Sequence, residues 1–113
     1  MREAPNTDLL DQIAEDFKHD QNVAMGTMFR SPGLRVRDKI FVFLSHKGQL
    51  IAKLPSDRAK ELVADGTAEP MVMGKRTMRE WIAFPPQAGL ATWREAAREA
   101  HEYVSAVSDP SRS

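Results

Sequence analysis

The densest pattern of apolar positions in the chain predicts three short strands. The runs 33–37, 39–44 and 49–54 are rich in β-branched and aromatic side chains, and tight turns separate them at residues 37–39 and 46–48. Short apolar runs bounded by turn residues are typical of antiparallel strands joined by hairpins. We therefore predict a three-stranded meander in this part of the chain.

The middle run of the meander is apolar on both faces. Ile40, Val42 and Leu44 are expected on one face. Phe41 and Phe43 are expected on the other, because side chains alternate along a strand. A strand that is apolar on both faces is typical of the interior of a sheet. We therefore expect the helices to pack on a sheet that has this strand in its middle.

Apolar stripes at helical spacing predict three helices. The first covers about residues 8–19. The second begins at Ser56, a favourable N-cap, and ends before Gly66, which is typical of the position after a helix. The third begins at Thr92, which is expected to form a capping box with Glu95.

Two more strands are predicted between the second and third helices, at residues 69–73 and 77–84. Residues 23–29 fit either a linker or part of a broken strand, and residues 31–33 (Ser-Pro-Gly) are expected to interrupt regular structure. The predicted order is α-β-β-β-α-β-β-α. This order indicates an α+β fold, with five antiparallel strands in a sheet and three helices on one side of it.

All 113 residues are expected to form one domain, because this length is ordinary for a single domain. The ordered core is predicted to cover about residues 8–107 and to include Trp81 and Trp93. Residues 1–6 and 108–113 are polar ends and are expected to be flexible.

The charge balance argues against one large class of function. The chain has 16 Lys and Arg residues and 16 Asp and Glu residues, so its formal net charge is zero. Non-specific nucleic-acid binding requires an excess of cations, and direct binding of nucleic acid is therefore not expected. The chain has no cysteine, no apolar run long enough to span a bilayer and no signal-peptide core at its start. A cytoplasmic protein without membrane contact is expected.

Basic side chains of the predicted sheet are the candidate binding residues. Arg35 and Arg37 are expected on one face of the first strand of the meander, and Lys53 and Arg79 lie on later strands. Further cations lie close to these in sequence: Arg30, Lys39, Lys47, Lys75 and Arg76. Together they fit a surface for an anion or an acidic partner. The alternative is ordinary edge-strand charge that prevents aggregation.

Catalytic chemistry is not indicated. Glu80 beside Trp81 is suited to general-base catalysis only if it is desolvated, and a solvated strand residue is the simpler interpretation. The histidines, His19, His46 and His101, lack the spacing of helical metal ligands. Nucleophile and phosphate-loop motifs are absent. We therefore expect no enzyme activity, no cofactor and no metal.

The order of several short motifs resembles the TfoX N-terminal domain family, which is related to YjbR-type proteins. These motifs are MF at 28–29, GLRV at 33–36, KIFVFL at 39–44, QLIAKLP at 49–55, EPM at 69–71, MREW at 78–81, and Trp93 followed by AREA at 97–100. The resemblance covers about residues 8–104. It implies a secretion-chaperone-like fold in a bacterial cytoplasmic protein. Founding members of the family are regulators of natural competence that act with a transcription factor.

The function expected from the resemblance is that of a non-enzymatic interaction module. Its partner would be a protein, in a regulatory process related to transcription, and pairing of two copies is expected by analogy with secretion chaperones. Two alternatives remain open: a domain that binds a small anion or ligand through Lys53 and the arginines, and a weak DNA-binding protein.

Overall fold

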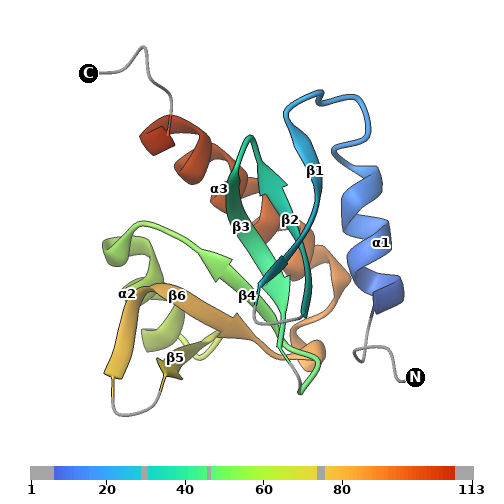
Figure 1. The fold of residues 1–113 in the computed structure, drawn as a ribbon. Helices are drawn as coiled ribbons and strands as arrows, with labels where there is room; N and C mark the ends of the chain where they lie inside the picture. Colours follow the sequence, from blue (N-terminus) through green and yellow to red (C-terminus); the bar gives the residue numbers. More distant parts are fainter. Residues whose placement is uncertain (1–6, 29–30, 46, 74–75, 109–113) are drawn as a thin grey trace.

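One antiparallel sheet of six strands organises the chain (Figure 1). The structure is a computed structural model that describes residues 7–28, 31–45, 47–73 and 76–108. Its elements are α1 (Thr7–Glu15), β1 (Val23–Met28), β2 (Ser31–Val36), β3 (Lys39–Leu44), β4 (Leu50–Lys53), α2 (Ser56–Ala64), β5 (Glu69–Met73), β6 (Arg76–Phe84), a short 3-10 helix (Pro86–Ala88) and α3 (Leu90–Ser108).

The predicted α+β class is confirmed, but the predicted number of strands is wrong. The strand order is β1-β2-β3-β4-β6-β5, so the additional strand, β1, forms one edge of the sheet. The sequence of β1 contains small residues and lacks clean alternation, and pairing with β2 determines its structure. β2 itself begins at Ser31, contrary to the expected interruption, and Pro32 lies opposite Thr27 of β1.

The three helices cover one face of the sheet. Buried residues of all three helices pack with the strands in the main hydrophobic core, in which Leu10, Leu62 and Trp93 represent α1, α2 and α3. A second, smaller buried cluster lies on the opposite face and contains only strand residues. Figure 1 shows α3 running behind β2 and β3, with α1 and α2 towards opposite ends of the sheet.

β3 lies inside the sheet as predicted, but a β-bulge changes which side chains share a face. Leu34 lies opposite Val42, whereas the next residue, Arg35, lies opposite Ile40, so Phe41 is an extra residue in β3. Phe41 and Val42 consequently both belong to the helix-side core. The predicted grouping of Ile40 with Val42 is wrong, because strict alternation does not hold across a bulge.

The ends of the helices agree only partly with the predicted caps. Gly66 has a φ of 83° and follows α2, as predicted. The N–H groups of Gly66 and Thr67 donate to the carbonyl oxygens of Val63 and Leu62, which is the Schellman pattern. Ser56 is not an N-cap, because α2 is preceded by Pro55 and has no side-chain cap.

The third helix begins earlier than predicted. α3 begins at Leu90, so Thr92 is already inside the helix and the expected capping box with Glu95 is not formed. Trp93 is fully buried, and its indole Nε1–H donates to the carbonyl oxygen of Pro85 at 3.0 Å. This bond holds the start of α3 against the end of β6. Among the described helices, none has the length and apolarity required to cross a membrane.

Candidate functional site

The face of the sheet without helices carries an apolar centre. Phe43, Ile51 and Ala83 are buried there, on the neighbouring strands β3, β4 and β6. Ile40, Met71 and Trp81 are only partly buried and pack around them. The rings of Phe43 and Trp81 meet edge to face, with centroids 5.5 Å apart. Partly exposed apolar side chains around a buried centre are typical of a surface that a partner covers.

Two glycines explain how Phe43 is buried without a helix above it. Gly26 and Gly33 lie opposite each other on β1 and β2. A Cβ on Gly33 would lie 2.7 Å from Phe43 Cβ and 2.5 Å from the carbonyl oxygen of Val42. A Cβ on Gly26 would lie 2.8 Å from Ile40 Cδ1. The absence of side chains at these two positions therefore lets residues of β3 lie close against the sheet.

Arg35 and Lys53 bring positive charge to this face from the two strands that flank β3. A Cβ on Gly26 would be 3.3 Å from Arg35 Cδ, so the Arg35 stem lies over the bare part of β1. Arg35 is exposed and forms no ion pair with the residues that the structure describes. Lys53 Nζ lies 5.8 Å from the centroid of the Trp81 ring, a cation–π distance.

Glu80 connects this margin of the sheet to α3. One carboxylate oxygen accepts a hydrogen bond of 2.6 Å from the Tyr103 hydroxyl, and the other lies 3.9 Å from Lys53 Nζ. The hydrogen bond to Glu80, assisted by partial burial, raises the pKa of the Tyr103 phenol above its ordinary value. The Glu80 side chain is 41% exposed, as expected for a solvated strand residue, and it also has a defined partner in Tyr103.

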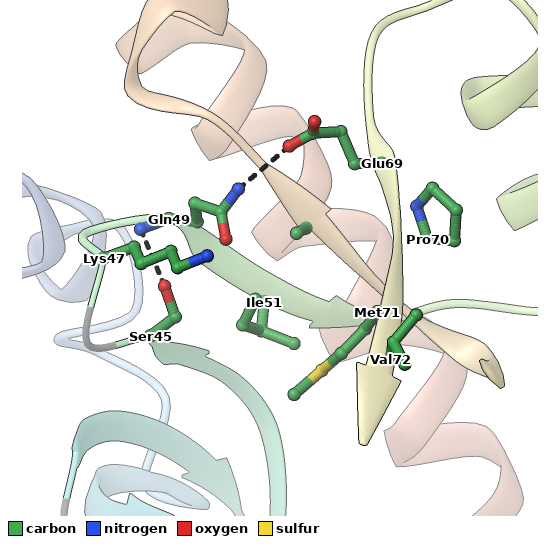
Figure 2. A pocket seen from close by; sticks show the side chains of 9 residues that line it. Ser45, Lys47, Gln49, Ile51, Glu69, Pro70, Met71 and Val72 are labelled. Atoms are coloured by element: carbon green, nitrogen blue, oxygen red, sulfur yellow. Dashed lines mark hydrogen bonds between the residues drawn. The ribbon is translucent and has the colours of Figure 1, made fainter. Parts of the chain in front are cut away.

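A groove hollows the same face between the β3–β4 turn and β5 (Figure 2). It measures about 530 Å³ and is lined by Ser45, Lys47, Gln49, Ile51, Glu69, Pro70, Met71, Val72 and Ala83. Ile51, Met71 and Ala83 also belong to the apolar centre, so the groove is a continuation of that surface. Gln49 Nε2 donates to a carboxylate oxygen of Glu69 across it at 2.9 Å. An apolar floor with a polar rim suits the side chain of a partner.

The structure brings together only part of the predicted basic set. Arg35 and Lys53 share the face without helices, whereas Arg37 does not lie on β2. Arg37 is in the β2–β3 turn with a φ of 58°, and its N–H donates to the carbonyl oxygen of Asn22. The expectation that Arg35 and Arg37 share a strand face is therefore wrong. Arg79 lies on β6, and its side chain is outside the described part of the structure.

Other predicted cations contribute little to this site. Arg30 and Lys75 lie outside the described residues, as does His46, and the side chain of Arg76 is not described. Lys47 lines the groove. The residues that sequence reasoning missed on this face are Phe43 and Ile40. Gly33 and Gly26, whose Cβ atoms would meet Phe43 and Ile40, are the signal that could have found them.

His101 has a packing role that its spacing in the sequence did not indicate. Its Nε2 lies 3.0 Å from an Asp20 carboxylate oxygen, and its ring contacts Phe17 and Phe41 at centroid distances of 5.1 and 5.4 Å. The pair ties the loop after α1 to α3. Within the described ranges, no group of three His, Asp or Glu side chains is arranged to hold a metal ion.

A second groove lies between α2 and α3, and it has its own ion pairs. It measures about 390 Å³ and has Arg58 and Glu99 in its wall. Arg58 Nε donates to Glu99 at 2.9 Å, and these bonds, together with Glu61, raise the pKa of the guanidinium. Since its main charges are already paired, this groove offers less to a ligand than the opposite face of the sheet.

The comparisons with known proteins add no relative to these observations. The chain matches no protein-family model, no curated protein and no solved structure. The candidate site is therefore defined by its geometry: an apolar centre, a groove at one side and, at the other, Arg35, which forms no ion pair with any residue that the structure describes.

Proposed function

We propose that this protein is a non-enzymatic binding module that recognises a segment of a partner protein on the helix-free face of its sheet. The observation that carries the proposal is the apolar centre of Phe43, Ile51 and Ala83, which is flanked by partly exposed Ile40, Met71 and Trp81. A helix layer seals the other face, so this face is available for a partner. The resemblance to TfoX N-terminal domains supports a regulatory role related to transcription.

The groove and the arginine define the chemistry of the partner segment. An apolar side chain of the partner is expected to enter the groove over Ile51 and Met71. An acidic side chain is expected to pair with Arg35, which lacks an ion pair with any described residue. Lys53 is a weaker contact, because Glu80 already lies 3.9 Å from its ammonium group.

This chemistry favours a protein partner over the two alternatives. Arg35 and Lys53 line neither the groove beside β5 nor the groove between α2 and α3, whereas a small-anion site requires cations that converge on one cavity. A DNA-binding surface requires a cationic stripe, and the formal net charge of this chain is zero.

A display selection with matched charge reversals tests the proposal. A random peptide library is selected against the wild-type protein, and single clones are then measured against two variants. Arg35→Glu reverses an exposed charge on the candidate face, and Lys60→Glu reverses an exposed charge on α2. Clones are expected to combine Asp or Glu with a large apolar residue. Their affinity should fall about tenfold for Arg35→Glu and remain within about twofold for Lys60→Glu.

Backbone amide shifts locate the bound peptide independently of the variants. The largest shift changes are expected on β3, β4 and β6, around Phe43, Ile51 and Ala83. Selected peptides that bind both variants equally and shift the amides of α2 or α3 would contradict the proposal.

A further inference from the structure

The two edges of the sheet differ in how they are protected against pairing with another strand. β1 and β5 are the terminal strands. β5 carries Glu69 and Pro70, and its ladder with β6 is irregular after Pro70. A charge, a proline and an irregular ladder all protect an edge. β1 has none of these, because its sequence VAMGTM is uncharged and its register with β2 is unbroken.

The free side of β1 can be identified from its hydrogen bonds. The carbonyl oxygen of Asn22 accepts from Arg37 N–H on the β2 side, whereas Val23 N–H turns away and donates to Asp20. Residues of an antiparallel strand direct their backbone groups alternately to the two sides. Met25 and Thr27 therefore present both N–H and C=O to the free side, and Val23 presents its C=O.

The surface around these groups is open in the isolated chain. Ala24, Met25 and Thr27 are exposed, and Met25 is 51% exposed although it is a large apolar residue. α1 packs mainly against β2 and α3. β1 is uncharged and exposed, and it presents both N–H donors and C=O acceptors along its outer side. Such a strand can form hydrogen bonds with a second copy of itself.

We propose that β1 pairs with β1 of a second copy, so that the protein is a two-fold dimer with one continuous sheet. Full overlap of residues 23–27 aligns Val23 with Thr27 of the second copy and Met25 with its own counterpart. In this register, Met25 N–H donates to Met25 C=O of the second copy and the reverse, and Thr27 N–H donates to the second Val23 C=O. This inference does not depend on the proposed function, since it uses the outward backbone groups of β1 and not the apolar centre of the helix-free face.

Light scattering after size exclusion tests the pairing with matched edge variants. The wild-type chain of 12.7 kDa is expected to elute at about twice that mass, roughly 25 kDa, at concentrations near 0.1 mM. Met25→Lys places like charges opposite each other and should give a monomer. Val72→Lys is the control, because Val72 is an apolar residue of similar exposure, at 58%, on the protected edge strand. It should remain a dimer.

A second variant keeps the test informative if Met25→Lys impairs folding. Thr27→Pro removes one outward N–H without removing a bond to β2, and it should also give a folded monomer. Circular dichroism confirms folding of each variant. A monomeric wild-type protein, or a dimer that persists in both folded β1 variants, would overturn the proposal.

Disulfide cross-linking tests the register. The chain has no cysteine, so single substitutions give clean probes. Directly opposite residues in a hydrogen-bonded antiparallel pair have Cα atoms about 5.5 Å apart, which suits a disulfide. Met25→Cys should form a covalent dimer on mild oxidation, and Val72→Cys should not. Equal rates for the two variants would show that the pairing as stated is wrong.

Discussion

The two faces of β3 bury aromatic side chains in different ways. Phe41 packs under the helix layer, where its ring meets Phe17 at 5.5 Å and His101 at 5.4 Å. Phe43 lies on the opposite face and is covered by neighbouring strand side chains, with Trp81 at its edge. Both residues are almost inaccessible to water, at 0% and 3%. Equal burial in one chain therefore does not mean equal packing, and only the Phe43 side has room for a further layer.

The largest expected effect compares these two rings directly. Phe41→Ala should lower the free energy of unfolding by about 3–5 kcal/mol, because it opens a cavity between the sheet and two rigid segments. Phe43→Ala should cost less, about 1–3 kcal/mol, because the surrounding side chains on an uncovered face can relax. Urea unfolding followed by circular dichroism measures both. Equal losses would show that the helix-free face is packed as firmly as the core.

The next effect tests the two glycines that allow residues of β3 to approach β1 and β2 closely. Gly33→Ala should destabilise by about 1–3 kcal/mol, because the new Cβ meets a backbone oxygen that cannot move away alone. Gly26→Ala is the matched control, since its Cβ would meet Ile40 Cδ1, the end of a flexible side chain. It should cost less than about 1 kcal/mol. Thermal unfolding of both variants gives the ranking, and a reversed ranking would contradict the close approach at Gly33.

Tyr103 tests the contact between the margin of the sheet and α3. Tyr103→Phe removes the hydrogen bond to Glu80 and should cost about 1 kcal/mol. The raised pKa of the phenol means that this bond stabilises the protein fully below the ordinary tyrosine pKa near 10. The contribution is lost as pH rises through the higher folded-state pKa.

The pH dependence separates this hydrogen bond from a simple packing effect. The wild-type protein should therefore lose stability above about pH 10 relative to Tyr103→Phe. Unfolding curves between pH 8 and 11 measure the difference. If the two proteins keep a constant separation across that range, the hydrogen bond to Glu80 does not account for the effect.

The smallest effect concerns charges on the solvent side of the helix layer. Arg58→Ala removes the ion pairs with Glu99 and Glu61 and should cost less than about 1 kcal/mol, because the guanidinium is partly exposed. The loss should shrink as salt is raised. Unfolding at 0.05 and 0.5 M salt checks this. A larger, salt-independent loss would mean that the Arg58 stem contributes packing between α2 and α3.

The fold was predictable where the periodic pattern was strong. β3, β5 and most of β6 were predicted from their apolar residues. In β6, Ile82 and Phe84 lie on the helix side while Trp81 and Ala83 lie on the other, as the alternation of a strand requires. β1 was not predicted as a complete strand, since Ala24 and Gly26 have little strand preference of their own and residues 23–29 also fitted a linker. Pairing with β2 stabilises β1 as a strand, although the local sequence has only a weak preference for one.

The candidate site was less predictable, because its character depends on register. Arg35 and Lys53 were expected on the sheet, but nothing local in the sequence shows that a bulge next to Arg35 turns Ile40 to the face of Phe43. Arg37 was misplaced for a similar reason, since its left-handed φ belongs to the turn. The sequence shows which residues are charged, but the pairing register of the strands determines which of them lie on the same face of the sheet.

Phe41, the extra residue of the bulge in β3, has a consequence for how the sheet would respond to a one-residue deletion. With Phe41 deleted, Ile40 and Val42 would become neighbours and would still point to opposite sides, opposite Arg35 and Leu34 as they do now. The ladder would therefore close without a shift. What would disappear is the contact of the Phe41 ring with Phe17 and His101, so the helix layer would lose packing at this point while the strands beneath it stayed in place.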